Sequence, residues 1–316
     1  MTQHIYIIFF LVLACTSTSL AQQEAQFTQF MYNQQILNPA YVGSRGAPSI
    51  SILYRDQWMG FAGSPRVGIA SFNMPILGNR IGFGLSIFNQ NMGITNTWYS
   101  TMAYAYNLQI NDDMSLRLGV QGSMKYSGMN FASEDARILN PGDPSVAEGQ
   151  VTNQYRGNVG LGVYFTFSDV LYAGISAPYL YSNNISLNRE TNRPAVEQPH
   201  YYGMVGGMLL ITDKIELKPA ILAKYTQHSP FDLDANVSLV FDRKLSAGLT
   251  YRLGGMGSGE SVDLLIFFQA STQVGLGVAY DFSLGDVSDY SSGTFEAMLR
   301  LDLKNEKTQL ENPRFF

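Results

Sequence analysis

Apolar and polar residues alternate one by one along most of this chain, and this period of two restricts the possible folds more than any other feature. Between positions 231 and 241 the odd-numbered residues are all apolar, whereas the even-numbered ones from Asp232 to Ser238 are polar. The stretches 245–253 and 295–303 repeat the pattern. Successive side chains of a strand point to opposite faces, whereas a helix would scatter either set around its axis. The chain from Ser49 onward is therefore predicted to be all-β.

The alternation predicts about fourteen strands, most of them close to the roughly 9–11 residues that cross a bilayer at a tilt. They are expected near residues 49–57, 66–74, 80–90, 97–110, 114–127, 155–167, 171–178, 200–211, 215–225, 231–241, 245–253, 261–270, 273–282 and 294–303. Every second connection is a tight turn, and the others are longer, above all 128–154 and 179–199. Short periplasmic turns and long extracellular loops are typical of outer-membrane proteins, so the predicted fold is an antiparallel transmembrane β-barrel.

The energetics of the bilayer predict which strand face meets lipid. A Lys or Arg that faces lipid at mid-bilayer costs roughly 2–4 kcal/mol, so charged strand residues are expected in the lumen or near strand ends. These residues are Arg117, Lys125, Glu216, Lys218, Asp232, Asp234 and Arg300. Glycine pairs recur on one face of some strands and would allow either sharp curvature or close packing of a lumenal plug. The pairs are Gly82/Gly84, Gly160/Gly162 and Gly275/Gly277.

The two ends of the chain lie outside the alternating region. An apolar run from Ile5 to Leu13, followed by small residues at Ser19 and Ala21, predicts a signal peptide that is cleaved after Ala21. Lipidation at Cys15 is the alternative. The even strand number places both termini in the periplasm. The predicted parts are a signal peptide (1–21), an N-terminal periplasmic or plug segment (22–48), the outer-membrane barrel (49–303) and a periplasmic C-terminal tail (304–316).

The segment 22–48 is too polar for a lipid-facing strand, and its Asn38-Pro39 pair favours a turn. Its apolar side chains nevertheless need burial. They could fold back as a plug in the barrel, dock on a periplasmic partner, or pack locally before the first strand. Three residues near the first outer loop could form a partner patch or part of an aromatic girdle. The candidate partner or plug contacts are Phe27, Phe30, Met31, Tyr32, Asn33, Asn38, Pro39, Tyr41, Arg55, Trp58 and Phe61.

Composition argues against several other classes of protein. A net charge of −5 gives no support for nucleic-acid binding, and a single cysteine allows neither an internal disulfide nor a cysteine metal cluster. Neither a nucleophile elbow nor a Walker-type loop is present in the sequence. The stretch 254–259 is rich in glycine, but no helix pattern follows it. His200 and His228 lie at a strand start and in a loop, and the acidic residues near 133–148 do not match a calcium loop. No catalytic role, cofactor or metal is predicted.

Several motifs, spread over almost all of the mature chain, resemble those of the PorP/SprF family of type IX secretion system membrane proteins. One departure is Phe295, where a polar residue, often His, is expected. The motifs are Gln29-Phe30-Met31-Tyr32-Asn33, Leu37-Asn38-Pro39-Ala40-Tyr41-Val42-Gly43, Tyr54-Arg55-Asp56-Gln57-Trp58-Met59-Gly60-Phe61 with Gly63-Ser64-Pro65, Ser176-Ala177-Pro178-Tyr179-Leu180, Lys224-Tyr225 through Leu249-Thr250-Tyr251-Arg252, Glu296-Ala297-Met298-Leu299 and Asn312-Pro313-Arg314-Phe315-Phe316.

This resemblance implies a barrel in the outer membrane of a Bacteroidota bacterium that works with the type IX secretion apparatus. Family members support secretion or surface anchoring of client proteins with C-terminal sorting domains, and some serve adhesins linked to gliding motility. The implied partners are ring-forming periplasmic lipoproteins, peptidoglycan-associated components, the client protein and outer-membrane lipid. Without the resemblance, an outer-membrane channel or hydrophobic-solute transporter would be the first hypothesis, because fold alone does not decide function.

Overall fold

The computed structural model describes residues 26–130, 151–168, 170–184, 196–227, 229–254 and 259–303. The predicted signal peptide with Cys15 and the predicted C-terminal tail lie outside these residues. His228, the acidic run near 133–148 and most of the glycine-rich stretch also lie outside them.

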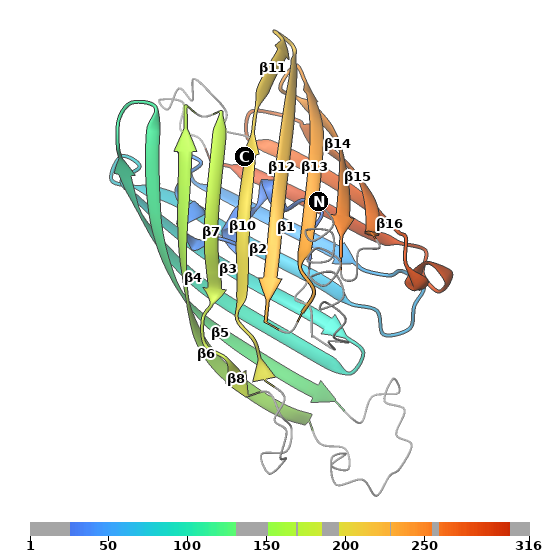
Figure 1. Cartoon of the computed structure of the whole chain (residues 1–316). Helices are drawn as coiled ribbons and strands as arrows, with labels where there is room; N and C mark the ends of the chain where they lie inside the picture. The colour runs from blue at the N-terminus through green and yellow to red at the C-terminus, as the bar shows by residue number, and fades with distance from the viewer. Residues whose placement is uncertain are drawn as a thin grey trace, which may run out of the picture.

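Antiparallel strands close into a barrel of fourteen strands, because β1 pairs with both β2 and β17, and β10 pairs with both β7 and β12 (Figure 1). β10 and β11 are two parts of one strand, interrupted at Met208, and both pair with β12. The barrel strands are β1 (Ser49–Asp56), β2 (Arg66–Ile76), β3 (Ile81–Met92), β4 (Thr95–Gln109), β5 (Met114–Asn130), β6 (Val151–Phe167), β7 (Leu171–Tyr179), β10 (His200–Gly207), β11 (Leu209–Thr212), β12 (Ile215–Thr226), β13 (Asp232–Phe241), β14 (Leu245–Leu253), β15 (Gly259–Gln269), β16 (Val274–Ser283) and β17 (Thr294–Asp302).

The predicted barrel is confirmed, and its strand bounds agree with the alternation to within a few residues. A separate short ladder joins β8 (Asn183–Asn184) to β9 (Val196–Glu197). One connection differs from the prediction: β3 and β4 are joined at the long-loop end by Gly93 and Ile94 alone. Gly93 has a φ of +53°, which suits a two-residue hairpin turn, so the ladder continues to the pair Met92 and Thr95.

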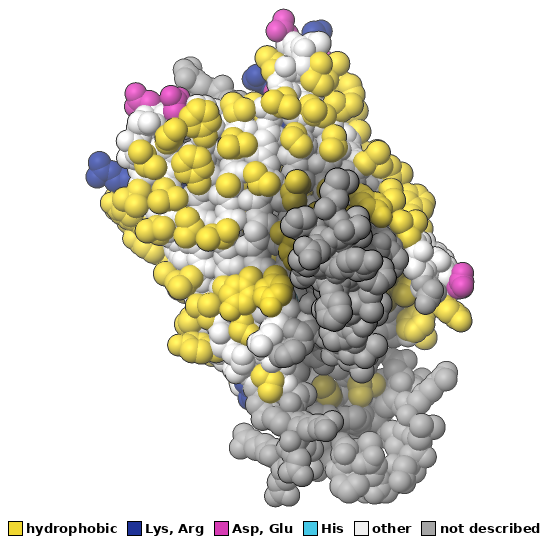
Figure 2. Space-filling view, viewed as in Figure 1, with side chains coloured by type: hydrophobic (Ala, Val, Ile, Leu, Met, Phe, Trp, Pro, Cys, Tyr) yellow, Lys and Arg dark blue, Asp and Glu magenta, His cyan; other side chains and the backbone are white. Residues whose placement is uncertain are grey.

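The barrel is apolar outside and polar inside, the reverse of a soluble protein. In β14, Leu249 and Tyr251 are exposed on the outer face, while Thr250 and Arg252 between and beside them are buried. Figure 2 shows apolar side chains spread over the outer wall, with charged ones gathered at its two ends. The charged residues predicted to avoid lipid all lie on lumenal strand faces. Among the described residues, no helix has the length and apolar character needed to cross a membrane.

Replacing Leu249 by arginine should destabilise the barrel strongly. Leu249 lies at the middle of β14 with half of its side chain exposed on the outer face. Arginine facing lipid at the midplane costs roughly 2–4 kcal/mol, against about 0–1 kcal/mol near the interface. The matched control is Leu253→Arg at the end of the same strand. Urea unfolding of both variants in lipid vesicles measures the difference, and equal losses would contradict the assigned lipid-facing midplane.

Candidate functional site

Residues 26–48 run through the lumen of the barrel, and residues 26–44 are called the plug below. The Gln26 amide donates to Asp232, which begins β13 at the long-loop end, over 3.3 Å. At the other end of the segment, the Leu303 amide donates to the Pro48 carbonyl over 2.7 Å, beside the short-turn start of β1. The chain therefore passes from the long-loop half to the short-turn end before the first strand begins.

The plug consists of three 3-10 turns, which are η1 (Phe30–Tyr32), η2 (Gln34–Ile36) and η3 (Pro39–Tyr41). Asn38 caps η3, because its side-chain oxygen accepts a hydrogen bond from the Ala40 amide over 2.9 Å. Proline suits the first position of such a turn, where its missing N–H has no partner in the turn. The Asn38-Pro39 pair therefore starts a turn, as its sequence predicts.

Aromatic side chains of the plug pack on walls that lie nearly opposite each other in the ring of strands. Tyr32 stacks on Phe267 of β15 with ring centroids 4.2 Å apart. Tyr41 meets Tyr164 of β6 edge to face at 5.5 Å. The buried Tyr32 hydroxyl donates to Ser246 of β14 over 3.1 Å. The plug is thus held from both sides of the lumen.

Polar contacts between the plug and the wall use backbone groups as well as side chains. The Asn38 amide donates to the Val163 carbonyl over 3.0 Å, and the Ser176 hydroxyl donates to the Leu37 carbonyl over 2.7 Å. The Gly43 amide donates to the Asn73 side-chain oxygen over 2.7 Å. Buried polar groups need such partners, and these contacts satisfy a segment that is rich in buried Gln and Asn.

Glycines of the wall form the seat of the plug. A Cβ added to Gly82 would stand 1.8 Å from the Val42 carbonyl oxygen, and one added to Gly119 would stand 2.2 Å from the Ala40 nitrogen. A Cβ on Gly162 or Gly277 would likewise meet a plug side chain at 2.1 Å. Real Cβ atoms essentially never come that close, so a larger residue at Gly82 or Gly119 would have to displace plug backbone. At Gly162 and Gly277 it would have to displace the ends of the Asn38 and Gln29 side chains. Close packing of the plug thus accounts for Gly82, Gly162 and Gly277 of the predicted glycine pairs.

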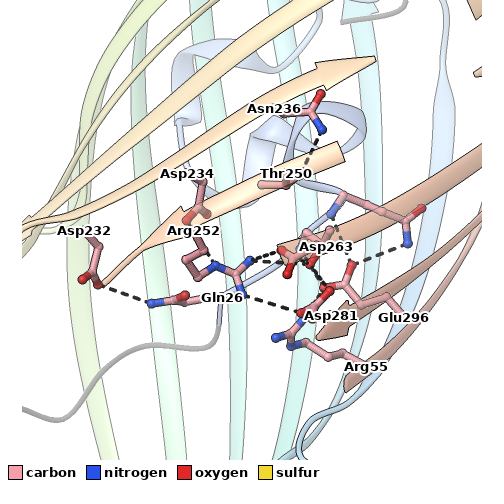
Figure 3. Close-up of polar contacts among 12 residues, drawn as sticks. Gln26, Arg55, Asp232, Asp234, Asn236, Thr250, Arg252, Asp263, Asp281 and Glu296 are labelled. Carbon is pink, nitrogen blue, oxygen red and sulfur yellow. Dashed lines mark hydrogen bonds and ion pairs between the residues drawn. The ribbon is translucent and has the colours of Figure 1, made fainter. Parts of the chain in front are cut away.

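A buried charge network joins the start of the plug to the wall (Figure 3). Arg55 of β1 pairs with Asp281 of β16 at 2.8 Å and with Glu296 of β17. Glu296 also accepts the backbone amides of Thr28 at 2.7 Å and Gln29 at 3.2 Å. The carboxylate of Glu296 therefore links the wall cation to two amides of the plug.

A second cation extends the network across neighbouring strands. Arg252 of β14 pairs with Asp234 at 3.1 Å, with Asp263 at 3.3 Å and with Asp281 at 3.6 Å. The Thr28 hydroxyl lies among these carboxylates and donates to Asp281 over 2.6 Å. Because all of these groups are buried, each charge depends on its partners for its stability.

The structure brings together most of the predicted contact residues and separates two of them. Arg55 lies next to the first outer loop as predicted, but it is buried in the lumenal network and not in a surface patch or girdle, because its position in β1 falls on the polar face. Trp58 and Phe61 lie in the loop after β1, where Phe61 is half exposed. The other predicted contact residues belong to the plug and are buried in the lumen. They are Phe27, Phe30, Met31, Tyr32, Asn33, Asn38, Pro39 and Tyr41.

Several residues of the site were not predicted to belong to it. Thr28, Gln29 and Gln35 lie in the plug among more prominent aromatic residues, and the acidic partners occur singly on the neighbouring strands β15, β16 and β17. One signal was available: Asp263, Asp281 and Glu296 each lie two to four residues inside the long-loop end of their own strands. That common depth predicts neighbouring lumenal positions once the ring order of the strands is known.

His200 and the buried carboxylates are the described residues whose surroundings bear on a catalytic or metal site. His200 begins β10 and stacks on Tyr202 with ring centroids 6.5 Å apart. In the part of the chain that the structure describes, no group of three or more His, Cys, Asp or Glu side chains is arranged to hold a metal ion. The buried carboxylates of the network are instead paired with arginines and with plug amides.

Comparison with protein families decides the assignment. The family model described as "Type IX secretion system membrane protein PorP/SprF" matches residues 19–301. The chain belongs to the PorP/SprF family. The predicted resemblance is therefore confirmed over most of the sequence, and Phe295 is an outward-facing residue of β17, away from the lumenal network. A barrel of this family is an outer-membrane protein. No curated protein is significantly similar to this chain.

Solved structures similar to this PorP/SprF chain are outer-membrane barrels of low sequence identity. The toluene transporter TodX of P. putida is 9% identical, with 89% of this chain and 95% of that chain covered and a TM-score of 0.48. A FadL homologue of Pseudomonas aeruginosa is 12% identical, with 92% and 97% covered and a TM-score of 0.47. Omp33 of Acinetobacter baumannii is 8% identical, with 81% and 98% covered and a TM-score of 0.45. At such values these likenesses carry no argument about function.

Proposed function

We propose that this PorP/SprF protein is a plugged, non-enzymatic platform in the outer membrane that supports secretion or surface anchoring of client proteins with C-terminal sorting domains. It would act through protein–protein contacts, with the client at the long-loop end and periplasmic components of the secretion apparatus at the short-turn end. The observation that carries this proposal is the lumen, which the chain's own residues 26–44 fill from wall to wall.

The plug favours a platform over the channel or hydrophobic-solute transporter. A solute path needs a lumen that is open or opens readily, whereas this plug is held by glycine seats, wall hydrogen bonds and a buried charge network. Leaving buried charges without partners costs about 3–5 kcal/mol for each broken pair, so release of the plug is expensive. The proposed partners are ring-forming lipoproteins, peptidoglycan-associated components and a secreted client such as a gliding adhesin. Both chain termini are proposed to be periplasmic.

Deleting the gene should remove one or a few proteins with C-terminal sorting domains from the cell surface and the medium. Quantitative proteomics of the surface and secreted fractions, compared with wild type and with a complemented strain, measures this loss. An unchanged surface proteome together with a defect in uptake of a defined solute would overturn the proposal and support the transporter. The purified wild-type protein should also show little ion conductance in planar bilayers, because its lumen is filled.

A further inference from the structure

Two neighbouring strands of the wall end at different heights at the short-turn end of the barrel. β7 begins there at Leu171, which pairs with Phe167 at the end of β6. On its other side β7 pairs with β10 only as far as Gly207, which faces Leu171 at the start of β7. The last hydrogen bond along this seam runs from the Met208 amide to the Val170 carbonyl over 2.8 Å. The strand that continues from β10 therefore outruns β7 at the short-turn end.

The continuing part, β11, has a free edge among the described residues. Over Leu209–Thr212 its strand pairing is with β12 alone. Figure 1 shows β11 at the top of the barrel, beyond the start of β7. Continued along the ring of strands, the free edge lies over the turn that joins β6 to β7.

Both faces of β11 are apolar and exposed. Leu209 is 57% exposed, Leu210 is 62% exposed and Ile211 is 56% exposed. Leu209 pairs with Leu217 on the outer face, whereas Leu210 pairs with Glu216, whose side chain is buried on the lumenal face. Lipid can cover an outer face, but it cannot cover Leu210 on the lumenal side. The exposed surface of Leu210 is therefore not covered by the described part of the chain.

An unpaired strand edge is a binding surface unless it is protected. Natural proteins protect such edges with charged residues, proline or bulges, and a free edge cannot lie in the hydrocarbon region because its backbone groups would have no partners. The four residues of β11 are Leu, Leu, Ile and Thr, and none of them is charged or proline. The register with β12 shifts between Leu210 and Thr212, so Leu209 and Leu210 are the regularly paired part of this edge. The edge thus has the composition of a strand that pairs with another strand. Because its backbone groups need partners, it must lie at the aqueous rim of the barrel.

We propose that β11 is the docking edge for an extended segment of a periplasmic component of the secretion apparatus, which adds to β11 as a further strand. This inference rests on the proposed function and names the surface through which the platform contacts its machinery. The backbone groups of the edge can pair only with an extended chain. Leu209 on the outer face and Leu210 on the lumenal face favour apolar side chains on both faces of the added strand.

The position of the edge selects the source of that segment. An added strand would lie over the β6–β7 turn, Ser168–Val170, and not beside the outer wall. A second barrel in the same membrane approaches from the side and meets the lipid-facing wall, so it does not reach this place. By the segregation of loop lengths, the short-turn end is periplasmic, and a periplasmic chain reaches the edge directly.

Leu210→Lys tests the docking edge, because a lysine on the lumenal side of an edge strand opposes pairing without placing a charge in lipid. We expect the variant to assemble in the outer membrane and to lose at least tenfold in secretion of the client proteins that depend on the gene. The matched control is Leu77→Lys, at a 69% exposed leucine of the β2–β3 turn at the same end, outside the paired residues of both strands. The control should secrete normally.

A photo-crosslinking amino acid at position 210 of the otherwise wild-type protein provides the second measurement, independent of how the lysine variant folds. A crosslink in living cells to an identified periplasmic component of the apparatus, absent from the same probe at position 77, is expected. Crosslinks only to lipid, or to a second copy of this chain, would overturn the inference. Normal secretion by Leu210→Lys in a strain whose gene deletion abolishes secretion would also overturn it, while leaving the proposed function intact. Unchanged secretion in the deletion strain would instead remove the proposed function.

Discussion

Replacing Gly119 by valine is expected to unseat the plug and open the barrel to ions. A Cβ at this position would stand 2.2 Å from the Ala40 nitrogen and 2.5 Å from the Pro39 carbonyl carbon, so backbone on one side must move. The wall is the stiffer side, because β5 is hydrogen-bonded along its length to β4 and to β6. The turn Pro39–Tyr41 therefore gives way, and the adjoining residues Val42 and Asn38 lose their contacts with Gly82 and Gly162.

Two measurements should report the unseated plug. Single-channel recording in planar bilayers should show a stable open conductance for Gly119→Val where the wild type has little. Trypsin should cut after Arg45, whose side chain is mostly buried and paired with Asp302 at 3.0 Å while the plug is seated. The free energy of unfolding should also fall by about 1–3 kcal/mol, as overpacking of a tight interior usually causes.

Gly122→Val is the matched control, on the outer face of the same strand. A Cβ at Gly122 meets nothing within 4 Å, so valine there adds apolar surface toward lipid without strain. This variant should match the wild type in conductance and in resistance to trypsin. If Gly119→Val and Gly122→Val behave alike in both measurements, the plug does not occupy the glycine seat in the membrane.

Arg55→Met should be among the most destabilising single substitutions in the lumen. The variant leaves Asp281 and Glu296 buried after the loss of their shared cation, and Glu296 also carries the hydrogen bonds to Thr28 and Gln29. Breaking a buried ion pair on one side costs about 3–5 kcal/mol, because the remaining charge has no solvent to replace its partner. Urea unfolding in lipid vesicles measures the loss.

Arg66→Met is the matched control on the next strand. Arg66 pairs with Asp56 at 3.5 Å, but its side chain is 63% exposed. Exposed pairs contribute about 0–1 kcal/mol, so this substitution should be nearly neutral. The double variant Arg55→Met/Glu296→Gln should lose less stability than the two single losses added together, since the residues interact directly. Strict additivity would contradict the direct pairing of Arg55 with Glu296.

Local patterns were enough to predict the strands of this barrel. The two faces of each strand can be predicted from its own sequence, because side chains alternate with a period of two whatever the neighbouring strand is. The stretch 245–253 therefore matched β14 residue for residue, and the charges of β12 and β13 fell on the lumenal side as predicted. Membership of the family was likewise evident from short motifs in the sequence.

The place of residues 26–48 was not evident from the same kind of pattern. Their aromatic side chains showed that burial was needed, but the segment has no strand period and its sequence names no partner surface. The contacts that hold it come from β2, β3, β5, β6, β7, β13, β14, β15, β16 and β17, so they exist only after the ring has closed. Gly82 and Gly119 similarly acquire their role only when Val42 and Ala40 lie against them.

The sequence by itself thus determined the period of the strands, the face that meets lipid and the end that carries the short turns, because each of these depends on neighbouring residues. The tertiary structure alone decided the pairing of Arg55 with Asp281 and Glu296, which stand 226 and 241 residues away. It also decided the free edge of β11, which depends on where β7 begins in the closed ring. Closure of the barrel and the stagger between its strands bring residues that are far apart in the sequence to the same depth. No local sequence period encodes which of these residues meet.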